Sequence, residues 1–342
     1  MSAASIRVLA GDTGGTNTRL AVFDGASVAP GASELKLVAE GRFPSPGSSG
    51  LSEIVLRFLG ECGLRPDRAT FGVAGPVRGG KVRATNLPWE VDAREVASAI
   101  GLPSVRLLND LEANAWGLRA LPAEAFVVLH DGAPGASGNA ALISAGTGLG
   151  QAGLYWDGTS HRPFACEGGH SSFSPRTPLE FALLDHLSQR FGHVSWERVL
   201  SGPGLANVFR FLLRHHGAPE PAWVAEAERA GGLPAAISDA AVAGSDELCV
   251  QALDLFCGFY GAEAGNLALK VMATGGVWLG GGVAPRILPK LRTSRIVASF
   301  LDKGRMRPLL ESIPVRVVND DRAALLGAAW HAAFAGDTRS WN

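Results

Sequence analysis

A chain of 342 residues is long enough for about two domains, each with its own core. Hydrophobic residues make up 46% of it and charged residues 18%, a composition that is ordinary for a folded protein and excludes an intrinsically disordered one. The 31 Lys and Arg balance the 32 Asp and Glu, so the chain lacks the excess basic charge typical of proteins that bind nucleic acid or membranes.

The absence of targeting segments and the pattern of cysteines both predict a cytoplasmic protein. Residues 1–5 are small and polar and a strand-like run follows at once, so no secretory signal is expected. The longest apolar segments, such as 271–284, are too short and too rich in glycine to cross a bilayer. The four cysteines form no C-x-x-C pair and no metal-finger spacing, which predicts reduced thiols and no cysteine-based zinc site.

Residues 6–23 predict a β-hairpin with an unusual turn. Two apolar runs flank the loop Gly11-Asp12-Thr13-Gly14-Gly15-Thr16-Asn17, whose glycines let the backbone approach a ligand closely. The backbone N–H groups of this loop, with its hydroxyl and amide side chains, could hold phosphate oxygens, and Asp12 could hold Mg²⁺ through water. The alternative is a surface hairpin with a flexible turn.

Strands and helices alternate after this hairpin. We expect a strand at 35–40, a helix at 51–59 and a strand at 69–74. Asp92, with Glu95 three residues on, predicts the capping box of a further helix. A short buried strand at 105–108 then ends at Asn109-Asp110, and a helix follows. This order predicts one α/β unit.

The next part of the chain repeats that order. Residues 126–129 predict a strand, and 141–156 predict a second hairpin around Gly146-Thr147-Gly148-Leu149-Gly150. Because this hairpin resembles the first in kind, a two-fold internal duplication is the simplest explanation. Two such loops, one from each half, could close on a polyphosphate from opposite sides.

The remaining elements are mostly helices. The first has complete start and stop signals: Thr177 as N-cap, Pro178 at N1, Glu180 completing a capping box and Gly192 as the stop. Ser195 is expected to cap a short helix, and Gly202-Pro203-Gly204 to form a turn. We then expect helices at 205–215, 222–230, 234–243 and 246–270, a buried strand running into three glycines and a helix over 277–285, a strand at 315–318 and a helix at 322–334 that packs back on the N-terminal half.

Two common nucleotide-binding motifs are excluded. The chain has no G-x-x-x-x-G-K-[ST], so it is not a P-loop enzyme. Residues 148–153 do match G-x-G-x-x-G, with Glu167 at the distance of a ribose-binding acid. However, Leu154-Tyr155-Trp156 ahead of Asp157-Gly158 predicts a strand and a turn, where a Rossmann loop would open a helix.

Asn109-Asp110 is the best candidate for catalysis. α/β folds place their chemistry at strand ends, and an aspartate there could accept the proton of an attacking hydroxyl in phosphoryl transfer. The alternative is that Asp110 merely N-caps the helix from Leu111.

Glu167-Gly168-Gly169-His170 places a carboxylate and an imidazole on a glycine-rich turn. A carboxylate can accept from two neighbouring hydroxyls of a polyol and histidine can make a third bond, which predicts a sugar site. A metal site is the competing interpretation, but further ligands at helical spacing are lacking. Glu197 could equally be a solvated first-turn acid that interacts with the helix dipole.

Together these stretches closely resemble the bacterial glucokinases of the hexokinase and actin-like ATPase superfamily. The residues that carry the resemblance are GDTGGTNTRL (11–20), TNLPW (85–89), NDLEA (109–113), SAGTGLG (144–150), EGGH (167–170), HVSWERVLSGPG (193–204), FCGFYGAEAGNLAL (256–269) and LGGGVAPR (279–286). The resemblance implies an α/β, two-domain actin-like ATPase (ribonuclease H-like) fold with an interdomain cleft. It implies a smaller domain of residues 1–119 plus 319–342 and a larger one of 120–318.

The resemblance also implies an activity, the ATP-dependent phosphorylation of D-glucose to glucose 6-phosphate with Mg²⁺. It makes Asp110 the catalytic base and also a sugar ligand. The other implied sugar ligands are Asn109, Glu167, His170 and Glu197. The implied nucleotide-binding residues are Asp12, Gly14, Gly15, Thr16, Asn17, Gly146, Thr147, Gly148, Gly280, Gly281 and Gly282, with Asp12 holding Mg²⁺ through water. Glucose and ATP are the implied partners, with no nucleic acid and no membrane, and a homodimer is expected from the family.

The chain departs from the broader sugar-kinase and repressor group in two ways. That group usually carries a cysteine-rich zinc motif after its sugar-binding histidine, whereas Ser171-Ser172-Phe173-Ser174 follows His170. There is no N-terminal helix-turn-helix, which argues against a repressor. Cys166 lies beside Glu167, so its oxidation or alkylation is expected to disturb the sugar site.

Two other functions stay open at this point. A non-catalytic actin-like ATP-binding module would share both phosphate loops but would not need the residues that contact hydroxyls. A kinase for another hexose, such as mannose or fructose, differs by so few hydroxyls that the contacts change only locally.

Overall fold

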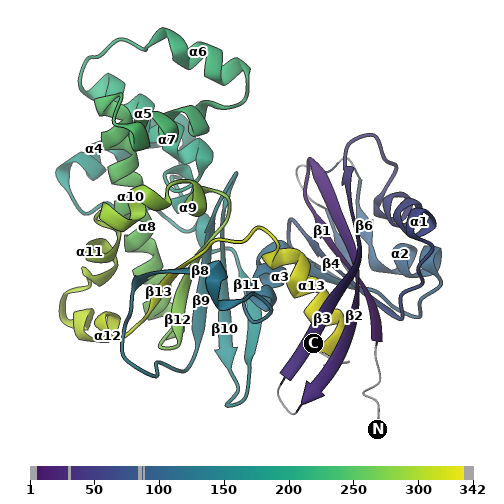
Figure 1. The fold of residues 1–342 in the computed structure, drawn as a ribbon. Coiled ribbons are helices and arrows are strands. Elements are labelled where there is room, and N and C mark those ends of the chain that lie inside the picture. Colours follow the sequence, from purple (N-terminus) through teal and green to yellow (C-terminus); the bar gives the residue numbers. More distant parts are fainter. Residues whose placement is uncertain (1–5, 30–31, 84–86, 88, 335–342) are drawn as a thin grey trace. The chain divides into compact units, whose positions relative to one another are not determined.

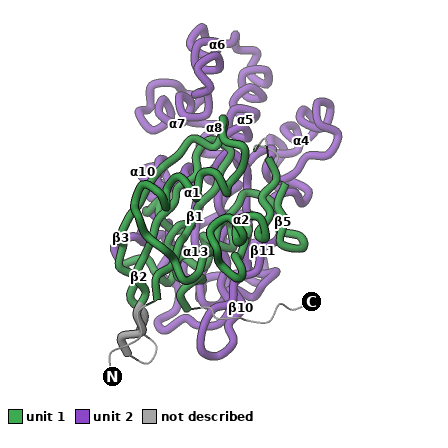
Figure 2. Tube along the Cα trace, turned by 90° about the vertical axis from the view of Figure 1, so that its right-hand side faces the viewer, with its two compact units in different colours: residues 1–123, 320–342 green, residues 124–319 purple. Residues whose placement is uncertain are grey.

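The computed structural model describes residues 6–29, 32–83, 87 and 89–334 (Figure 1). The chain divides into two compact units, which Figure 2 distinguishes by colour. Unit 1 is Met1–Ala123 with Asp320–Asn342, and unit 2 is Glu124–Asn319. The divisions fall a few residues beyond those expected from the sequence. The 3₁₀ turn η1 (Ala123–Ala125) contains the first of them.

Unit 1 is built on a five-stranded sheet in the order β3-β2-β1-β4-β7. The strands are β1 (Ile6–Thr13), β2 (Asn17–Ala29), β3 (Ala32–Pro44), β4 (Arg68–Val73) and β7 (Arg106–Asn109). β1, β2 and β3 pair antiparallel, whereas β4 and β7 run parallel to β1. A short pair, β5 (Lys81–Val82) and β6 (Val91–Asp92), lies outside this sheet.

Helices cover both faces of the sheet of unit 1 (Figure 1). The helices are α1 (Leu51–Cys62), α2 (Ala93–Ile100), α3 (Asp110–Gly117) and α13 (Ala323–Phe334). In β1, Leu9 packs in the cluster that contains α1 and α2, whereas Val8 and Ala10 pack against α13. Because β1 is buried on both sides, its sequence is a continuous apolar run rather than an alternating one.

Unit 2 has a six-stranded sheet in the order β11-β10-β9-β12-β13-β8. The strands are β8 (Phe126–His130), β9 (Ala140–Ala145), β10 (Leu149–Trp156), β11 (His161–Cys166), β12 (Gly276–Gly280) and β13 (Val315–Val318). β9, β10 and β11 pair antiparallel, and β12 and β13 run parallel to β9. The first five positions therefore repeat the order and directions of unit 1, as the predicted duplication requires. β8 is an added antiparallel edge strand.

The helices of unit 2 surround α8, whose central part is buried. They are α4 (Pro178–Phe191), α5 (Gly202–His215), α6 (Ala222–Arg229), α7 (Leu233–Ala243), α8 (Glu247–Val271), α9 (Val283–Arg286), α10 (Leu288–Thr293), α11 (Ile296–Leu301) and α12 (Arg307–Glu311), with the 3₁₀ turns η2 (Gly168–His170), η3 (Trp196–Arg198) and η4 (Gly304–Met306). The predicted apolar stripe of α8, which includes Leu253 and Phe256, is fully buried. β11 and α10 to α12 were not predicted from the sequence.

Several predicted helix ends are confirmed. The Asp92 side chain accepts a hydrogen bond from the Arg94 backbone N–H at 2.8 Å and caps α2. The Thr177 hydroxyl accepts from the Glu180 N–H at 3.3 Å, and α4 stops at Gly192. These signals are local, so the sequence alone predicts them.

The predicted turn at Gly202-Pro203-Gly204 is wrong, because these residues form the first turn of α5. The Ser201 hydroxyl accepts from the Gly204 N–H at 3.0 Å and caps the helix. Proline is tolerated there because the first N–H groups of a helix have no partner inside it. Ser195 is the N-cap residue of the short helix η3, as predicted, but its hydroxyl makes no cap bond.

The C-terminal helix packs back on the N-terminal part of the chain, as predicted. α13 and α3 approach so closely that glycine is required at the crossing. A Cβ atom on Gly117 would lie 1.9 Å from the Ala323 carbonyl oxygen, and one on Gly327 would lie 1.8 Å from the Ala113 oxygen. α13 therefore fixes α3, the helix that begins at Asp110.

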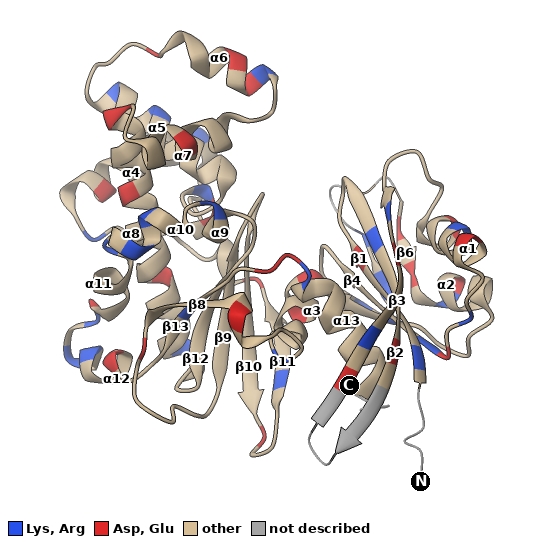
Figure 3. Cartoon of the chain, viewed as in Figure 1, with Lys and Arg blue, Asp and Glu red and all other residues tan. Residues whose placement is uncertain are grey.

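Charge is spread over both units. Basic and acidic residues intermingle along their elements (Figure 3), in keeping with the balanced composition. Among the described residues, no helix is both long enough and apolar enough to span a membrane.

The glycine contact between α3 and α13 predicts a large loss of stability in the variant Gly327→Ala. The added methyl group would force the two backbones apart, at a cost of about 3 kcal/mol in the free energy of unfolding. Gly60→Ala is the matched control, because Gly60 is an exposed residue of α1 with no atom within 4 Å of a built Cβ. This control is expected to gain up to about 1 kcal/mol from helix propensity. Urea unfolding measures both, and equal stabilities would contradict the tight crossing.

Candidate active site

The carboxyl ends of three parallel strands bring the unit 1 candidates together. Thr13 at the end of β1 pairs with Val73 of β4, which in turn pairs with Asn109 of β7. Since neighbouring strands lie about 5 Å apart, the first hairpin loop and Asn109 are separated by about 10 Å along one edge of the sheet. The prediction that these residues lie at strand ends is confirmed.

Ser45, which the sequence analysis did not single out, holds the first hairpin loop in place. Its hydroxyl donates to the Gly14 carbonyl oxygen at 2.7 Å, and its backbone N–H donates to the Thr16 oxygen at 3.0 Å. The Gly14 N–H closes the turn by donating to the Asn17 oxygen at 3.0 Å. The loop is therefore a fixed turn rather than a flexible one. A serine in a Gly/Pro/Ser-rich stretch gives no signal of such contacts.

Two polar groups at the end of β1 are shielded from water, the Asp12 carboxyl in part and the Thr13 hydroxyl fully. Burial raises the pKa of the Asp12 carboxyl, which the paired Arg19 on β2 only partly opposes. The Thr13 hydroxyl is buried and has no hydrogen-bond partner among the described residues. A buried carboxylate gains from a nearby cation, and a buried hydroxyl from an acceptor. Asp12 and Thr13 are consecutive in β1, so their side chains point to opposite faces of the sheet, and it is the Asp12 carboxylate that fits a bound Mg²⁺.

Asn109 and not Asp110 caps the helix that follows β7. The Asn109 Oδ1 accepts from the N–H groups of Leu111 at 2.9 Å and Glu112 at 3.4 Å, and its Nδ2 donates to the Gly75 oxygen at 3.1 Å. The hypothesis that Asp110 only N-caps this helix is therefore wrong. Asp110 is the first residue of α3, and its Oδ1 accepts from the Leu111 N–H at 3.0 Å.

Glu112 completes a capping box with Asn109. Its carboxylate accepts from the Asn109 backbone N–H, but burial outweighs this bond and raises the pKa of Glu112 to about 7. The spacing of Asn109 and Glu112 is the N-x-x-E pattern of a capping box. That pattern is the sequence signal from which the cap could have been assigned to Asn109.

In unit 2 the backbone of Leu149, the first residue of β10, joins two of the predicted segments. Its N–H donates to the Glu197 carboxylate at 2.9 Å. Its carbonyl oxygen lies against Gly169, where a Cβ atom would approach to 1.9 Å. The hypothesis that Glu197 is merely a solvated first-turn acid is wrong, because it binds the second hairpin directly. Gly148 is required beside it, since a Cβ there would lie 2.6 Å from the Glu197 Oε2.

Glu167 and His170 project from the 3₁₀ turn η2. Their side chains are exposed, and the Glu167 Oε2 lies 3.9 Å from the His170 Nε2. The turn is joined to the segment of Glu197 by a backbone bond, from the Trp196 N–H to the Ser171 oxygen at 3.0 Å. The structure thus gathers Glu167, His170 and Glu197 within unit 2, and Asn109, Asp110 and Asp12 within unit 1.

A cavity of about 520 Å³ in unit 2 collects part of the predicted nucleotide set. Gly146, Thr147 and Gly282 line it, together with the starts of α5, α7 and α9. No atom lies within 4 Å of a Cβ built on Gly146 or Gly282, so both backbones face open space. Gly280 and Gly281 do not line this cavity. Gly280 is the buried end of β12, and Gly281 packs against the Ala145 oxygen.

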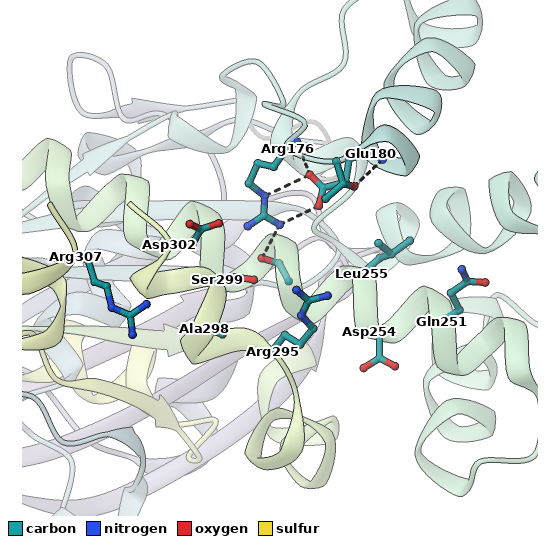
Figure 4. A pocket seen from close by; sticks show the side chains of 12 residues that line it. Arg176, Glu180, Gln251, Asp254, Leu255, Arg295, Ala298, Ser299, Asp302 and Arg307 are labelled. Carbon is teal, nitrogen blue, oxygen red and sulfur yellow. Dashed lines mark hydrogen bonds and ion pairs between the residues drawn. The ribbon is translucent and has the colours of Figure 1, made fainter. Parts of the chain in front are cut away.

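A second cavity in unit 2, of about 400 Å³, is lined by no predicted site residue (Figure 4). Its charged groups are largely paired already. Arg176 binds Glu180 at 3.0 Å, and Asp254 and Arg307 bind Lys290 and Glu311, each at 2.8 Å. Satisfied ion pairs offer a ligand little, so the cavity beside Gly146 is the better candidate for a nucleotide.

The stretch TNLPW and the metal-site interpretation of the Glu167–His170 turn are not part of the site described above. Of the stretch TNLPW, residues 85, 86 and 88 lie outside the described residues. In the part of the chain that the structure describes, no three His, Cys, Asp or Glu side chains gather as metal ligands would, at the Glu167–His170 turn or elsewhere.

The sequence and the fold were compared with known proteins. Residues 9–335 match the glucokinase family. The chain is 38% identical to a glucokinase of Synechocystis, over 97% of this chain and 99% of that one, and 39% identical to one of Nostoc over 95% and 98%. A crystal structure of a glucokinase from an Antarctic psychrotroph has a TM-score of 0.81 at 34% identity, over 94% of this chain and 97% of that one. A glucokinase from Streptomyces griseus, solved with glucose and AMPPNP, has a TM-score of 0.64 at 24% identity, over 95% and 99%, and so shows a shared fold.

The raised pKa of Glu112 predicts that stability falls with rising pH. Between about pH 4.5 and 7 the folded protein keeps a proton that the unfolded chain has lost, so the free energy of unfolding decreases through this window and levels off above it. Glu112→Gln keeps the cap but cannot ionise, and is expected to gain up to about 3 kcal/mol over the native protein between pH 5 and 8.

Urea unfolding at pH 5, 7 and 8 measures this difference. Glu95→Gln is the matched control, because Glu95 occupies the same helix position in α2 but is exposed. Its difference from the native protein is expected to stay small at each pH. A Glu112→Gln difference that is the same at pH 5 and pH 8 would rule out the raised pKa.

Proposed function

The chain belongs to the glucokinase family, and we propose that it transfers the γ-phosphoryl group of ATP to the 6-hydroxyl of glucose with Asp110 as the general base. The observation that carries the proposal is the position of Asp110 at the start of α3, on the same sheet edge as the Asp12–Asn17 loop. A base and a phosphate loop at one edge are what in-line transfer to a hydroxyl requires.

Asp110 would orient the 6-hydroxyl and accept its proton late in the transfer. The Leu111 N–H donates to its carboxylate and so orients it at the start of α3. Asn109, beside Asp110, would bind a sugar hydroxyl through its side-chain amide. Glu167, His170 and Glu197 would contact the remaining hydroxyls, since two carboxylates and an imidazole supply acceptors and a donor for a polyol.

The two hairpin loops would hold the nucleotide. In unit 1 the backbone of Gly14 and Gly15 with Thr16 and Asn17 would face the phosphates, and Asp12 would hold Mg²⁺ through water. Mg²⁺, when bound, offsets negative charge on the phosphate oxygens. In unit 2 Gly146, Thr147 and Gly148 would form the second loop. The cavity lined by Gly282 would take the adenosine, with Gly280 and Gly281 supporting its wall.

We propose further that the two units act as the two domains of the enzyme and that glucose draws them together. Closure would exclude water, which otherwise competes with the sugar for the phosphoryl group. A related fold solved with glucose and AMPPNP supports this pair of ligands. A homodimer and a cytoplasmic location stay predictions from the resemblance and the composition.

Replacing the base predicts a loss of turnover without a loss of sugar affinity. Asp110→Asn is expected to lower kcat about 10²–10⁴-fold, because the amide cannot accept the proton, while glucose binding changes only a few-fold. Asp246→Asn is the matched control, because asparagine also caps a helix well at the start of α8. Coupled assays of ADP release measure kcat, and near-normal turnover of Asp110→Asn would reject the assignment.

Replacing a sugar ligand predicts the opposite pattern. Glu167→Ala is expected to weaken glucose binding about 100-fold, because hydroxyls lose a charged hydrogen-bond partner. His170→Ala should act in the same direction. Calorimetric titration with glucose in the absence of nucleotide measures both, with the exposed Glu226→Ala as control. Failure of the native protein to bind glucose would favour the non-catalytic ATP-binding module instead.

A further inference from the structure

Two polar side chains on the buried face of α8 have no part in the proposed chemistry. Tyr260 and Glu263 are both 0% exposed, although α8 is otherwise lined by apolar residues over this stretch. They are three positions apart, so they lie on one side of the helix. A buried hydroxyl and a buried carboxylate are costly unless bonded, so their partners show what they do.

Tyr260 bridges two strands at the point where they separate. β9 and β12 last pair at Ser144 and Gly280. Around this last pair the Tyr260 hydroxyl accepts from the Ala145 N–H at 3.4 Å and can donate to the carbonyl oxygens of Gly280 at 3.0 Å or Ile143 at 3.2 Å. The Tyr260 hydroxyl thus links β9 and β12 where the backbone pairing of these two strands ends.

The strand ends that Tyr260 joins lead directly into the proposed nucleotide site. Ala145 is followed by Gly146 and Thr147, and Gly280 by Gly281 and Gly282. Gly146, Thr147 and Gly282 line the cavity of about 520 Å³. The spacing of the two walls of this cavity therefore depends on the bridge at their base.

Glu263 is bonded at both carboxylate oxygens to amide donors. The Gln151 Nε2 donates to its Oε1 and the Asn266 Nδ2 to its Oε2, both at 2.9 Å. Lys270 lies 3.7 Å from Oε1, which balances the charge. Gln151 is itself 1% exposed, so its bond to Glu263 is buried.

Gln151 links Glu263 to the proposed sugar-binding turn, because its side chain contacts both. A Cβ atom on Gly168 would lie 2.1 Å from the Gln151 Oε1, so the glutamine side chain packs directly on the backbone of the turn. Gly168 is flanked by Glu167 and lies two residues before His170. The orientation that Glu263 imposes on Gln151 therefore sets where this turn rests on β10.

We infer that Tyr260 and Glu263 are positioning residues for different substrates, Tyr260 for the nucleotide and Glu263 for the sugar, so that α8 aligns both binding loops. The inference rests on the proposed function, since it takes the two loops to be the ATP and glucose sites. It predicts that replacing Tyr260 changes the KM for ATP and that replacing Glu263 changes the KM for glucose.

Tyr260→Phe removes the bridge and keeps the ring. The Ala145 N–H and the Gly280 oxygen lose their partner and the strand ends are free to shift, so the KM for ATP is expected to rise about tenfold. The KM for glucose should stay within about twofold. The matched control is Tyr155→Phe, because Tyr155 is the only other tyrosine of the chain and is 56% exposed.

Glu263→Gln is expected to affect the binding of glucose instead of ATP. Glutamine places an NH₂ group where one of the two carboxylate oxygens was, so either Gln151 or Asn266 then faces a donor instead of its acceptor. The KM for glucose is expected to rise about tenfold with the KM for ATP within about twofold. Glu247→Gln, an exposed residue of the same helix, is the matched control.

The exchange variant Gln151→Glu with Glu263→Gln tests the link itself. The amide introduced at position 263 can then donate to the carboxylate introduced at position 151 and accept from Asn266, so both bonds are restored with the donor and the acceptor exchanged. This double variant is expected to recover most of the glucose KM. Should Glu263→Gln fail to fold, Gln151→Met breaks the same link from its other end and should likewise raise the KM for glucose alone.

Three results separate the hypotheses. A split of the two KM values, with ATP affected by Tyr260→Phe and glucose by Glu263→Gln or Gln151→Met, supports the inference. If each variant shifts both KM values together, or shifts neither, the positioning roles are wrong and the side chains serve stability only. If the native protein releases no ADP in the presence of glucose and ATP, the proposed function itself fails.

Discussion

The direction of the first strand in each sheet decides which edge carries the candidate chemistry. A hairpin turn lies at the carboxyl end of its first strand, and every strand parallel to that strand ends at the same edge. In unit 1 this rule brings Asp110, after β7, to the edge that carries the Asp12–Asn17 loop. In unit 2 it brings Gly282, after β12, to the edge of Gly146 and Thr147. The same topological constraint therefore accounts for the candidate residues of unit 1 and for those of unit 2.

Close backbone contacts turn these edges into fixed surfaces. Gly148 leaves room for the Glu197 carboxylate, Gly169 rests on the Leu149 oxygen and Gly281 on the Ala145 oxygen. A Cβ atom would clash with a backbone oxygen at Gly169 and Gly281 and would displace the Glu197 side chain at Gly148, so the glycines permit the packing of one segment on another. The glycine-rich stretches are therefore held by their neighbours before any ligand arrives.

The sequence predicted well wherever the deciding interactions are local. The two hairpins, the caps at Asp92 and Thr177 and the buried stripe of α8 each depend on residues a few positions apart, and all are confirmed. It failed where neighbouring residues compete for one role. Asn109 and Asp110 are both good N-cap residues, and only the geometry at the end of β7 assigns the cap to Asn109. Likewise, a Gly-Pro-Gly run suits a turn or a first helical turn, and Ser201 decides for the helix.

The order of most elements, the duplication, the family resemblance and the residue types at the strand ends follow from the sequence alone. Only the tertiary structure decided that Ser45 holds the first loop, that Glu197 binds the Leu149 N–H, and that Tyr260 and Glu263 reach the second hairpin. The physical reason is the distance along the chain. Caps and hairpins form from neighbouring groups, whereas these bonds join residues dozens of positions apart, whose encounter depends on how the whole unit packs.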